Sequence, residues 1–186
     1  MIRTFIAVTP PEDVRLGIAE GIREVRAHAP DAKWVAAENF HFTLRFLGNI
    51  EEERLDLLAE CVAKSVAGEA PFDVTISGLG AFPSATRPRV LWVGTGPGAD
   101  RLVGVARLVE AGLRKKGFGK ADRAFVPHLT VARWRRPQRS PEFAEFIESR
   151  SLEAQPFRVE AVRVMESKLR PRGPIYSVRA ECRLMG

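Results

Sequence analysis

Two short segments of the 186-residue sequence place a histidine and a threonine two residues apart in an otherwise apolar run. The first is HFTLRFLG, residues 41–48, and the second is HLTVARW, residues 128–134. Two of the three histidines in the chain therefore lie in one repeated pattern. Because residues i and i+2 of a β-strand point to the same face, each segment predicts an imidazole beside a hydroxyl group.

This arrangement is suited to acid–base catalysis of phosphoryl transfer. A neutral imidazole can take a proton from an attacking water, while a protonated imidazole gives one to the leaving oxygen. The ordinary histidine pKa of about 6.5 allows both forms near neutral pH. We therefore predict His41 and His128 as the catalytic pair, and the symmetry of the pattern leaves their roles open. The hydroxyl groups of Thr43 and Thr130 can donate hydrogen bonds to phosphate oxygens.

Other catalytic and metal-binding classes lack their motifs in this sequence. Cys61 and Cys182 are isolated, and no cluster of histidine, cysteine and carboxylate residues has metal-ligand spacing. A GxSxG nucleophile motif is absent, and GTGPG at residues 94–98 does not match the phosphate-loop pattern GxxxxGK[ST]. The sequence therefore predicts neither a metal ion nor a cofactor.

Positive charge is concentrated in residues 101–140. This segment has eleven lysines and arginines against Glu110 and Asp122, a local charge of +9, whereas the whole chain carries +6. A solvated surface and a binding face for an anion such as a phosphodiester both explain such a block. Both interpretations stay open, although the block runs directly into the second histidine segment.

Composition and the amino-terminal sequence limit the class of protein. With 45% hydrophobic residues, the chain can fill a globular core. The apolar run in MIRTFIAVTPPED is too short for a signal peptide, and no stretch reaches the length of a membrane span. We therefore expect a cytoplasmic protein with no membrane partner. We also expect it to be a monomer.

The elements that must position the two histidines are predicted from hydrophobic periodicity and turn residues. Strands are predicted at residues 3–8, 41–48, 72–80, 89–94, 128–134, 157–167 and 174–184. Helices are predicted at residues 10–28, 51–68, 100–116 and 141–149. Strands and helices thus recur along the whole chain.

These elements form an internal repeat. His41 and His128 are 87 residues apart (128 − 41), and FDV at 72–74 precedes FRV at 157–159 by 85 (157 − 72). Each half runs helix, histidine strand, helix, strand, turn, strand, which predicts a duplicated α+β unit of roughly 85 residues. We expect one catalytic domain over residues 1–186, in which two pseudo-symmetric lobes bring the histidines together across a groove.

The two HxTx tetrads, His41–Leu44 and His128–Val131, resemble those of the 2H phosphoesterase superfamily. Within it, the chain resembles the RNA 2′,3′-cyclic phosphodiesterases, also called LigT-type 2′-5′ RNA ligases. The likeness includes RTFIAV at 3–8, AFPSATRPRVLWVG at 81–94 and ESKLRPRGPIY at 166–176. It therefore covers nearly the whole chain.

The resemblance implies a bilobal α+β fold in which two antiparallel sheets flank a central cleft. It implies hydrolysis of 2′,3′-cyclic phosphates, on RNA ends or cyclic nucleotides, to 2′-phosphomonoesters. His41 would give a proton to the leaving 3′ oxygen, and His128 would activate water. Thr43 and Thr130 would hold the phosphate, and Arg133 would add positive charge.

The position of Arg133 conflicts with simple strand geometry. Strict alternation from His128 places Arg133 on the core face, so it reaches the cleft only if the strand twists, bulges or ends early. Arg45 lies four residues after His41, so strict alternation places it on the same face as His41. The family resemblance gives it no role.

Three functions stay open at this stage. The first is the cyclic phosphodiesterase, and the second is a 2′-5′ ligase that uses a ribose hydroxyl in place of water in the same cleft. The third is a non-catalytic RNA-binding module. If the basic block contacts RNA, we expect Arg135, Arg136 and Arg139 to act on the binding of long RNAs.

Overall fold

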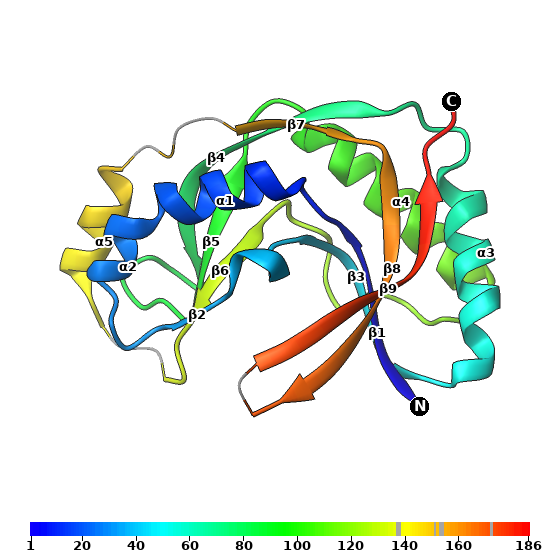
Figure 1. The fold of residues 1–186 in the computed structure, drawn as a ribbon, viewed down its shortest axis with the longest axis horizontal. Coiled ribbons are helices and arrows are strands. Elements are labelled where there is room, and N and C mark those ends of the chain that lie inside the picture. The colour runs from blue at the N-terminus through cyan, green and yellow to red at the C-terminus, as the bar shows by residue number, and fades with distance from the viewer. Residues whose placement is uncertain (137–138, 151, 153–154, 172) are drawn as a thin grey trace.

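The computed structural model describes residues 1–136, 139–150, 152, 155–171 and 173–186 (Figure 1). Its strands are β1 (Ile2–Val8), β2 (Lys33–Trp34), β3 (Phe42–Ile50), β4 (Phe72–Phe82), β5 (Val90–Thr95), β6 (Leu129–Arg133), β7 (Gln155–Val159), β8 (Ala161–Arg170) and β9 (Gly173–Arg183). Its helices are α1 (Glu12–Gly21), α2 (Arg23–Ala27), α3 (Leu55–Val66), α4 (Ala99–Lys115) and α5 (Pro141–Glu148), with short 3-10 turns η1 (Ala37–Asn39) and η2 (Glu52–Arg54). Among the described residues, no helix has the length and apolar character needed to cross a membrane.

The strands form a sheet in the order β7-β4-β5-β6-β3-β1-β8-β9, with β2 added beside β6. Its two halves, β7-β4-β5-β6 and β3-β1-β8-β9, correspond to the two predicted antiparallel sheets. They meet where Phe42 of β3 pairs with Leu129 of β6. Since these residues directly follow His41 and His128, the junction brings the two histidine segments together.

The repeat is interleaved in space. The hairpin β4–β5 follows the first histidine strand in sequence, yet β5 pairs with β6, which follows the second histidine. Strand β8, from the second half of the chain, pairs in turn with β1. Each half-sheet therefore combines strands from both halves of the sequence.

Two predicted elements are divided in the structure. Residues 157–167, predicted as one strand, belong to β7 and β8, which lie in different half-sheets on either side of Glu160. Glu160 belongs to neither strand, and its carbonyl accepts a hydrogen bond from the amide of Leu184, just beyond β9. The helix predicted at residues 10–28 is likewise divided, because the backbone leaves helical geometry at Ile22 (φ −95°, ψ 7°). Periodicity alone does not detect such breaks, because the apolar spacing continues through them.

Helices cover the sheet in two groups (Figure 1). Helix α3 packs on α4 and β9, while α1 contacts β7 and α5 contacts β4. Helix α4 turns Leu102, Val105, Val109 and Leu113 inward, all with 0% exposure. Their three- and four-residue spacing is that of one helix face, so burial of this stripe stabilises the helix against the sheet.

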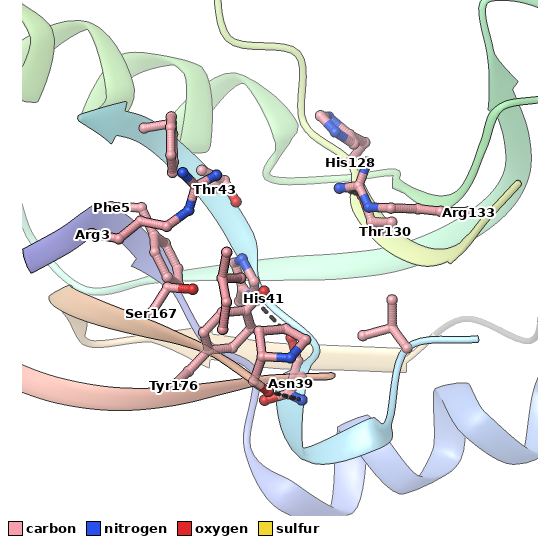
Figure 2. Close-up of a pocket in the computed structure, with 14 residues that line it drawn as sticks. Arg3, Phe5, Asn39, His41, Thr43, His128, Thr130, Arg133, Ser167 and Tyr176 are labelled. Atoms are coloured by element: carbon pink, nitrogen blue, oxygen red, sulfur yellow. Dashed lines mark hydrogen bonds between the residues drawn. The ribbon is translucent and has the colours of Figure 1, made fainter. Parts of the chain in front are cut away.

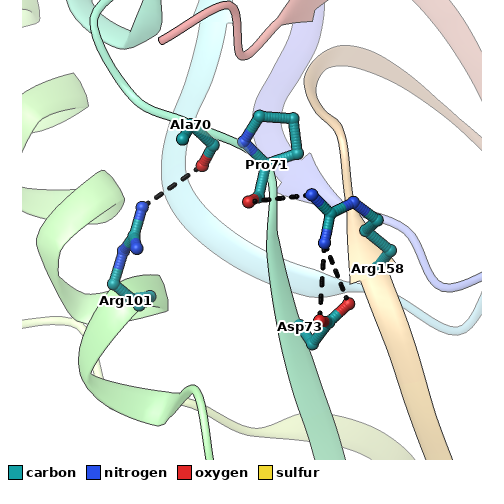
Figure 3. A network of polar contacts seen from close by, with 5 residues as sticks. All are labelled: Ala70, Pro71, Asp73, Arg101 and Arg158. Carbon is teal, nitrogen blue, oxygen red and sulfur yellow. Dashed lines mark hydrogen bonds and ion pairs between the residues drawn. The ribbon is translucent and has the colours of Figure 1, made fainter.

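The outer pairing of β4 with β7 is marked by polar contacts (Figure 3). Asp73 of β4 lies opposite Arg158 of β7, and the Arg158 Nη1 atom is 3.4 Å from both carboxylate oxygens. Arg158 also donates to the Pro71 carbonyl at 3.4 Å, while Arg101 of α4 donates to the Ala70 carbonyl at 3.2 Å. Both members of the ion pair are exposed, so it contributes to strand register more than to stability.

Both histidine strands contain a bulge at the fourth tetrad position. Against β1, Ala7 pairs with Thr43 and Ile6 with Arg45, so Leu44 is an extra residue. Against β5, Trp92 pairs with Thr130 and Leu91 with Ala132, so Val131 is extra. The side chains that follow each bulge therefore change faces.

Strict alternation of side chains predicted the wrong face for Arg45 and for Arg133, because each strand contains a bulge before that residue. Arg45 does not share the face of His41 but is 9% exposed and packs toward α4. Val131 and Ala132 are both fully buried, so Arg133 emerges on the side of Thr130. Under strict alternation, Arg133 reaches the cleft only through a twist, a bulge or an early strand end, and the structure contains the bulge.

A polar link connects this bulge to the segment that precedes His128. The Glu110 Oε2 atom of α4 lies 3.2 Å from Arg45 Nε, and Glu110 Oε1 accepts a hydrogen bond from the Ala121 amide at 2.9 Å. We predict that Glu110→Leu lowers the free energy of unfolding by about 2 kcal/mol, because it leaves the buried guanidinium of Arg45 without its partner. Urea denaturation measures the change.

The double variant Arg45→Leu/Glu110→Leu should recover part of this loss, because it removes both charges. The matched control is Glu60→Leu, which breaks the exposed pair of Glu60 with Lys64 on α3. A loss in Glu110→Leu no larger than in this control would mean that the buried pair has no structural role.

Candidate active site

Both tetrads open onto one cavity of about 390 Å³ at the junction of β3 and β6 (Figure 2). The side chains predicted from the sequence all line this cavity: His41, Thr43, His128, Thr130 and Arg133. The first two come from the β3 segment and the other three from the β6 segment. The tertiary structure therefore brings together residues that lie almost ninety positions apart.

Each imidazole is oriented by a backbone carbonyl two residues earlier. The Nδ1 atom of His41 is 2.7 Å from the Asn39 carbonyl, and that of His128 is 2.7 Å from the Val126 carbonyl. Because a carbonyl oxygen only accepts, Nδ1 of each ring carries the hydrogen. The atom that gains or loses a proton is therefore Nε2, which is unprotonated in the neutral ring and protonated in the cation. Each histidine can thus serve as base or acid at the same atom.

The surroundings of both rings favour the neutral form. Burial lowers the pKa of His41, and the nearby charges of Arg133 and His128 lower it further, against the opposing hydrogen bond to Asn39. Burial and the Arg133 charge likewise lower the pKa of His128, against the hydrogen bond to Val126. The positive charge of Arg133 therefore lowers the pKa of both histidines.

Arg133 also approaches the second threonine. Its Nη2 atom lies 3.5 Å from Thr130 Oγ1, at the edge of hydrogen-bonding distance. A guanidinium beside a hydroxyl group, with two imidazoles facing the same cavity, forms a site for a singly or doubly charged oxyanion. Within the described residues, no group of three or more His, Cys, Asp or Glu side chains is placed to hold a metal ion.

An aromatic wall surrounds His41 that sequence reasoning did not identify. The ring centroid of His41 lies 4.8 Å from that of Phe5 and 5.2 Å from that of Tyr176, which meets it edge-on. Burial raises the pKa of the Tyr176 phenol, so it stays protonated and able to donate. The motifs around these residues contributed to the family resemblance, but only the order β3-β1-β8-β9 places them beside His41.

His128 has a more open environment. Phe82, from the end of β4, meets its ring edge-on at 5.1 Å. On the other side of the cavity, the guanidinium of Arg3 from β1 lies 4.5 Å from the ring centroid of Phe46 from β3, and both residues line the cavity. Phe46 follows His41 by five residues, as Arg133 follows His128, so the two bulges place an aromatic ring and a cation at equivalent positions.

Sequence comparison assigns a class to this fold and its two-histidine cavity. The sequence model described as "LigT like Phosphoesterase" matches residues 8–92 and again residues 93–176. The chain therefore belongs to the LigT-like phosphoesterase family. The two matches begin 85 residues apart (93 − 8), in agreement with the predicted duplication.

Named relatives are similar over almost the full chain. An RNA 2′,3′-cyclic phosphodiesterase of Thermotoga maritima is 34% identical over 186 residues, which cover 100% of this chain and 97% of the relative. The RNA 2′,3′-cyclic phosphodiesterase of Archaeoglobus fulgidus is 35% identical over 176 residues, which cover 94% and 96% of the two chains.

Solved structures confirm the predicted bilobal α+β fold. A crystal structure of a Thermus thermophilus protein superposes with a TM-score of 0.82 at 30% identity, covering 99% of this chain and 98% of that one. E. coli LigT in complex with 3′-AMP has a TM-score of 0.73 at 22% identity, covering 100% of this chain and 99% of that one. The second likeness concerns the fold alone.

The shared influence of Arg133 can be tested by titration. We predict that Arg133→Gln raises the pKa of both His41 and His128, because removing a nearby cation makes protonation less unfavourable. In the unaltered chain, both should titrate below about 6.5. The imidazole proton shifts in NMR spectra measure each ring separately, with His41→Ala and His128→Ala to assign them. A response from only one ring would contradict the central position of Arg133.

Proposed function

We propose that this chain is an enzyme that hydrolyses 2′,3′-cyclic phosphate ends of RNA to 2′-phosphomonoesters without a metal ion. One observation carries the proposal: His41 and His128, both held through Nδ1, line one cavity with two threonines and Arg133. The names of the Thermotoga maritima and Archaeoglobus fulgidus relatives support the same substrate.

The reaction is an in-line displacement at phosphorus. Nε2 of neutral His128 takes a proton from water as the water oxygen bonds to phosphorus, and the bond from phosphorus to O3′ breaks. Protonated His41 gives its Nε2 proton to O3′, leaving a 3′-hydroxyl and a 2′-phosphomonoester. The assignment of acid and base follows the family resemblance. Proton exchange with solvent then restores both rings.

The remaining side chains act on the phosphate. The hydroxyl groups of Thr43 and Thr130 donate to its non-bridging oxygens, and Arg133 stabilises the negative charge that develops during attack. The bound anion also raises the pKa of the histidines, opposing the effect of burial and Arg133. Substrate binding thereby favours the protonated His41 that the reaction requires.

Residues 1–186 are proposed to act as one catalytic domain. Each half-sheet contains strands from both sequence repeats, so neither repeat contains a complete half of the site. Both tetrads lie in one chain, and the proposed reaction therefore needs no second copy. These features support a monomeric enzyme.

We predict that His41→Ala and His128→Ala each lower kcat by roughly 10² to 10⁴, because each removes one proton-transfer group. The matched control is His28→Ala, since the third histidine stacks on Phe146 of α5 and lies outside the cavity lining. It should retain the activity of the unaltered chain, as should the chain in EDTA.

The assay uses an oligonucleotide that ends in a 2′,3′-cyclic phosphate. A 2′-phosphate product supports hydrolysis, whereas a longer 2′-5′ joined product identifies the ligase alternative, and binding without change identifies an RNA-binding module. Full activity of either cavity variant, or loss of activity in EDTA, would refute the two-histidine mechanism.

The pH dependence should be bell-shaped for kcat/KM. At low pH the rate falls because the base becomes protonated, and at high pH it falls because the acid loses its proton. Since burial and Arg133 lower the pKa of both histidines, the maximum should lie on the acid side of about 6.5. Rates measured with a cyclic mononucleotide test this, and a steady increase from about pH 5 to 9 would contradict the mechanism.

A further inference from the structure

A second cavity adjoins the one that holds the tetrads. It has a volume of about 1100 Å³ and shares five residues with the first: Thr43, Phe46, His128, Thr130 and Arg133. It then continues between the turn from Phe82 to Val90 and the segment from Ala121 to Val126. We call this second cavity the distal groove. None of the proposed chemical steps uses its outer part.

The outer part of the distal groove combines three cations with aromatic rings and a single carboxylate, Asp122. Arg87, Arg89 and Arg123 line it and are exposed, and within the described chain no carboxylate forms an ion pair with any of them. Phe82 and Phe125 contribute half-buried rings. Guanidinium groups suit phosphodiesters, and aromatic faces suit unpaired bases.

The backbone around these arginines is held in place. The Arg89 amide donates to the Phe82 carbonyl at 2.8 Å, and the Arg89 carbonyl accepts from the Trp134 amide at 3.0 Å. The first hydrogen bond closes the β4–β5 turn, and the second ties this turn to the segment that follows Arg133. The distal groove is therefore attached to the same strand that carries the second tetrad.

We propose that the distal groove binds the RNA nucleotides immediately 5′ to the cyclic phosphate. This inference rests on the proposed function and assigns the part of the protein that would hold the RNA strand beyond its reacting end. A terminal ribose whose 2′ and 3′ oxygens form the cyclic phosphate continues into the strand only through its 5′ oxygen. The strand must therefore leave the first cavity in one direction, and the distal groove is continuous with that cavity.

Size and charge support this occupant. Single small-molecule sites have volumes of about 300 to 1,000 Å³, so the first cavity of about 390 Å³ suits the reacting end alone. The distal groove is large enough for further nucleotides, whose phosphates would meet Arg87, Arg89 and Arg123. A free cyclic nucleotide would leave these three side chains without an anionic partner.

The same geometry revises the interpretation of the basic block. Arg135, Arg136 and Arg139 are exposed beyond β6, and none of them lines either of these cavities. Of the eleven cations in residues 101–140, the distal groove includes Arg123 and Arg133, and it adds Arg87 and Arg89 from outside the block. Exposed arginines of the block thus provide matched controls.

The test compares a cyclic mononucleotide with four- and eight-nucleotide RNAs that end in a 2′,3′-cyclic phosphate. The variants are Arg87→Ala, Arg89→Ala and Arg123→Ala, with Arg135→Ala as the control and thermal unfolding to verify folding. Each groove variant should raise KM for the RNAs roughly three- to tenfold, because it removes one charged contact. KM for the mononucleotide should not change.

Salt dependence provides a second measurement. For the RNAs, each groove variant should reduce the log–log salt slope by about 0.7, the contribution of one phosphate contact on a single strand. Equal effects on short and long substrates, or an effect of Arg135→Ala as large as that of the groove variants, would overturn the inference.

The two proposals fail in different ways. If the unaltered chain hydrolyses the mononucleotide but KM does not fall with RNA length, only the distal-groove inference is wrong. If it hydrolyses neither substrate, the proposed function is wrong and the inference that rests on it is overturned as well.

Discussion

The pairing of Phe42 with Leu129 is the contact on which the site depends. Both side chains are fully buried, and their strands join the two half-sheets at this position. Each residue directly follows a histidine, so the contact that closes the sheet also fixes where the two imidazoles enter the cavity. Burying these two large apolar side chains stabilises the junction by about 2 kcal/mol for each. Packing energy and the geometry of the proposed active site are therefore supplied by adjacent positions.

The bulges after Thr43 and Thr130 give the two pseudo-symmetric strands different chemistry. Each bulge turns the residue five positions beyond its histidine toward the cavity, which brings in Phe46 on one side and Arg133 on the other. The side chain one position earlier turns away, and Arg45 there pairs with Glu110 instead. A duplicated backbone can thus supply two similar proton-transfer groups and still place positive charge at one defined point.

Burial has opposite consequences for the two proposed roles. A lowered pKa keeps the base neutral and ready to accept a proton, but it disfavours the protonated acid. Arg133 strengthens this conflict in the free protein, because its charge acts on both rings. An anionic substrate counteracts that charge, so the protonation state needed for reaction is favoured most when the phosphate is bound. In the proposed mechanism, the same residue would therefore link substrate recognition to proton transfer.

The sequence by itself determined the tetrads, the duplication and most helices, because these depend on local spacing. An imidazole and a hydroxyl two residues apart share a strand face, and an apolar stripe such as that of α4 marks a buried helix face. Tertiary structure alone decided the interleaving of the repeats, the break at Glu160, the wall of Phe5 and Tyr176, and the presence of Arg87 and Arg89 in a cavity that His128 also lines. Strand partners and bulges are set by pairing between distant segments. A one-residue bulge reverses the face of every side chain that follows, so local periodicity placed His41 and His128 correctly but misplaced Arg45 and Arg133.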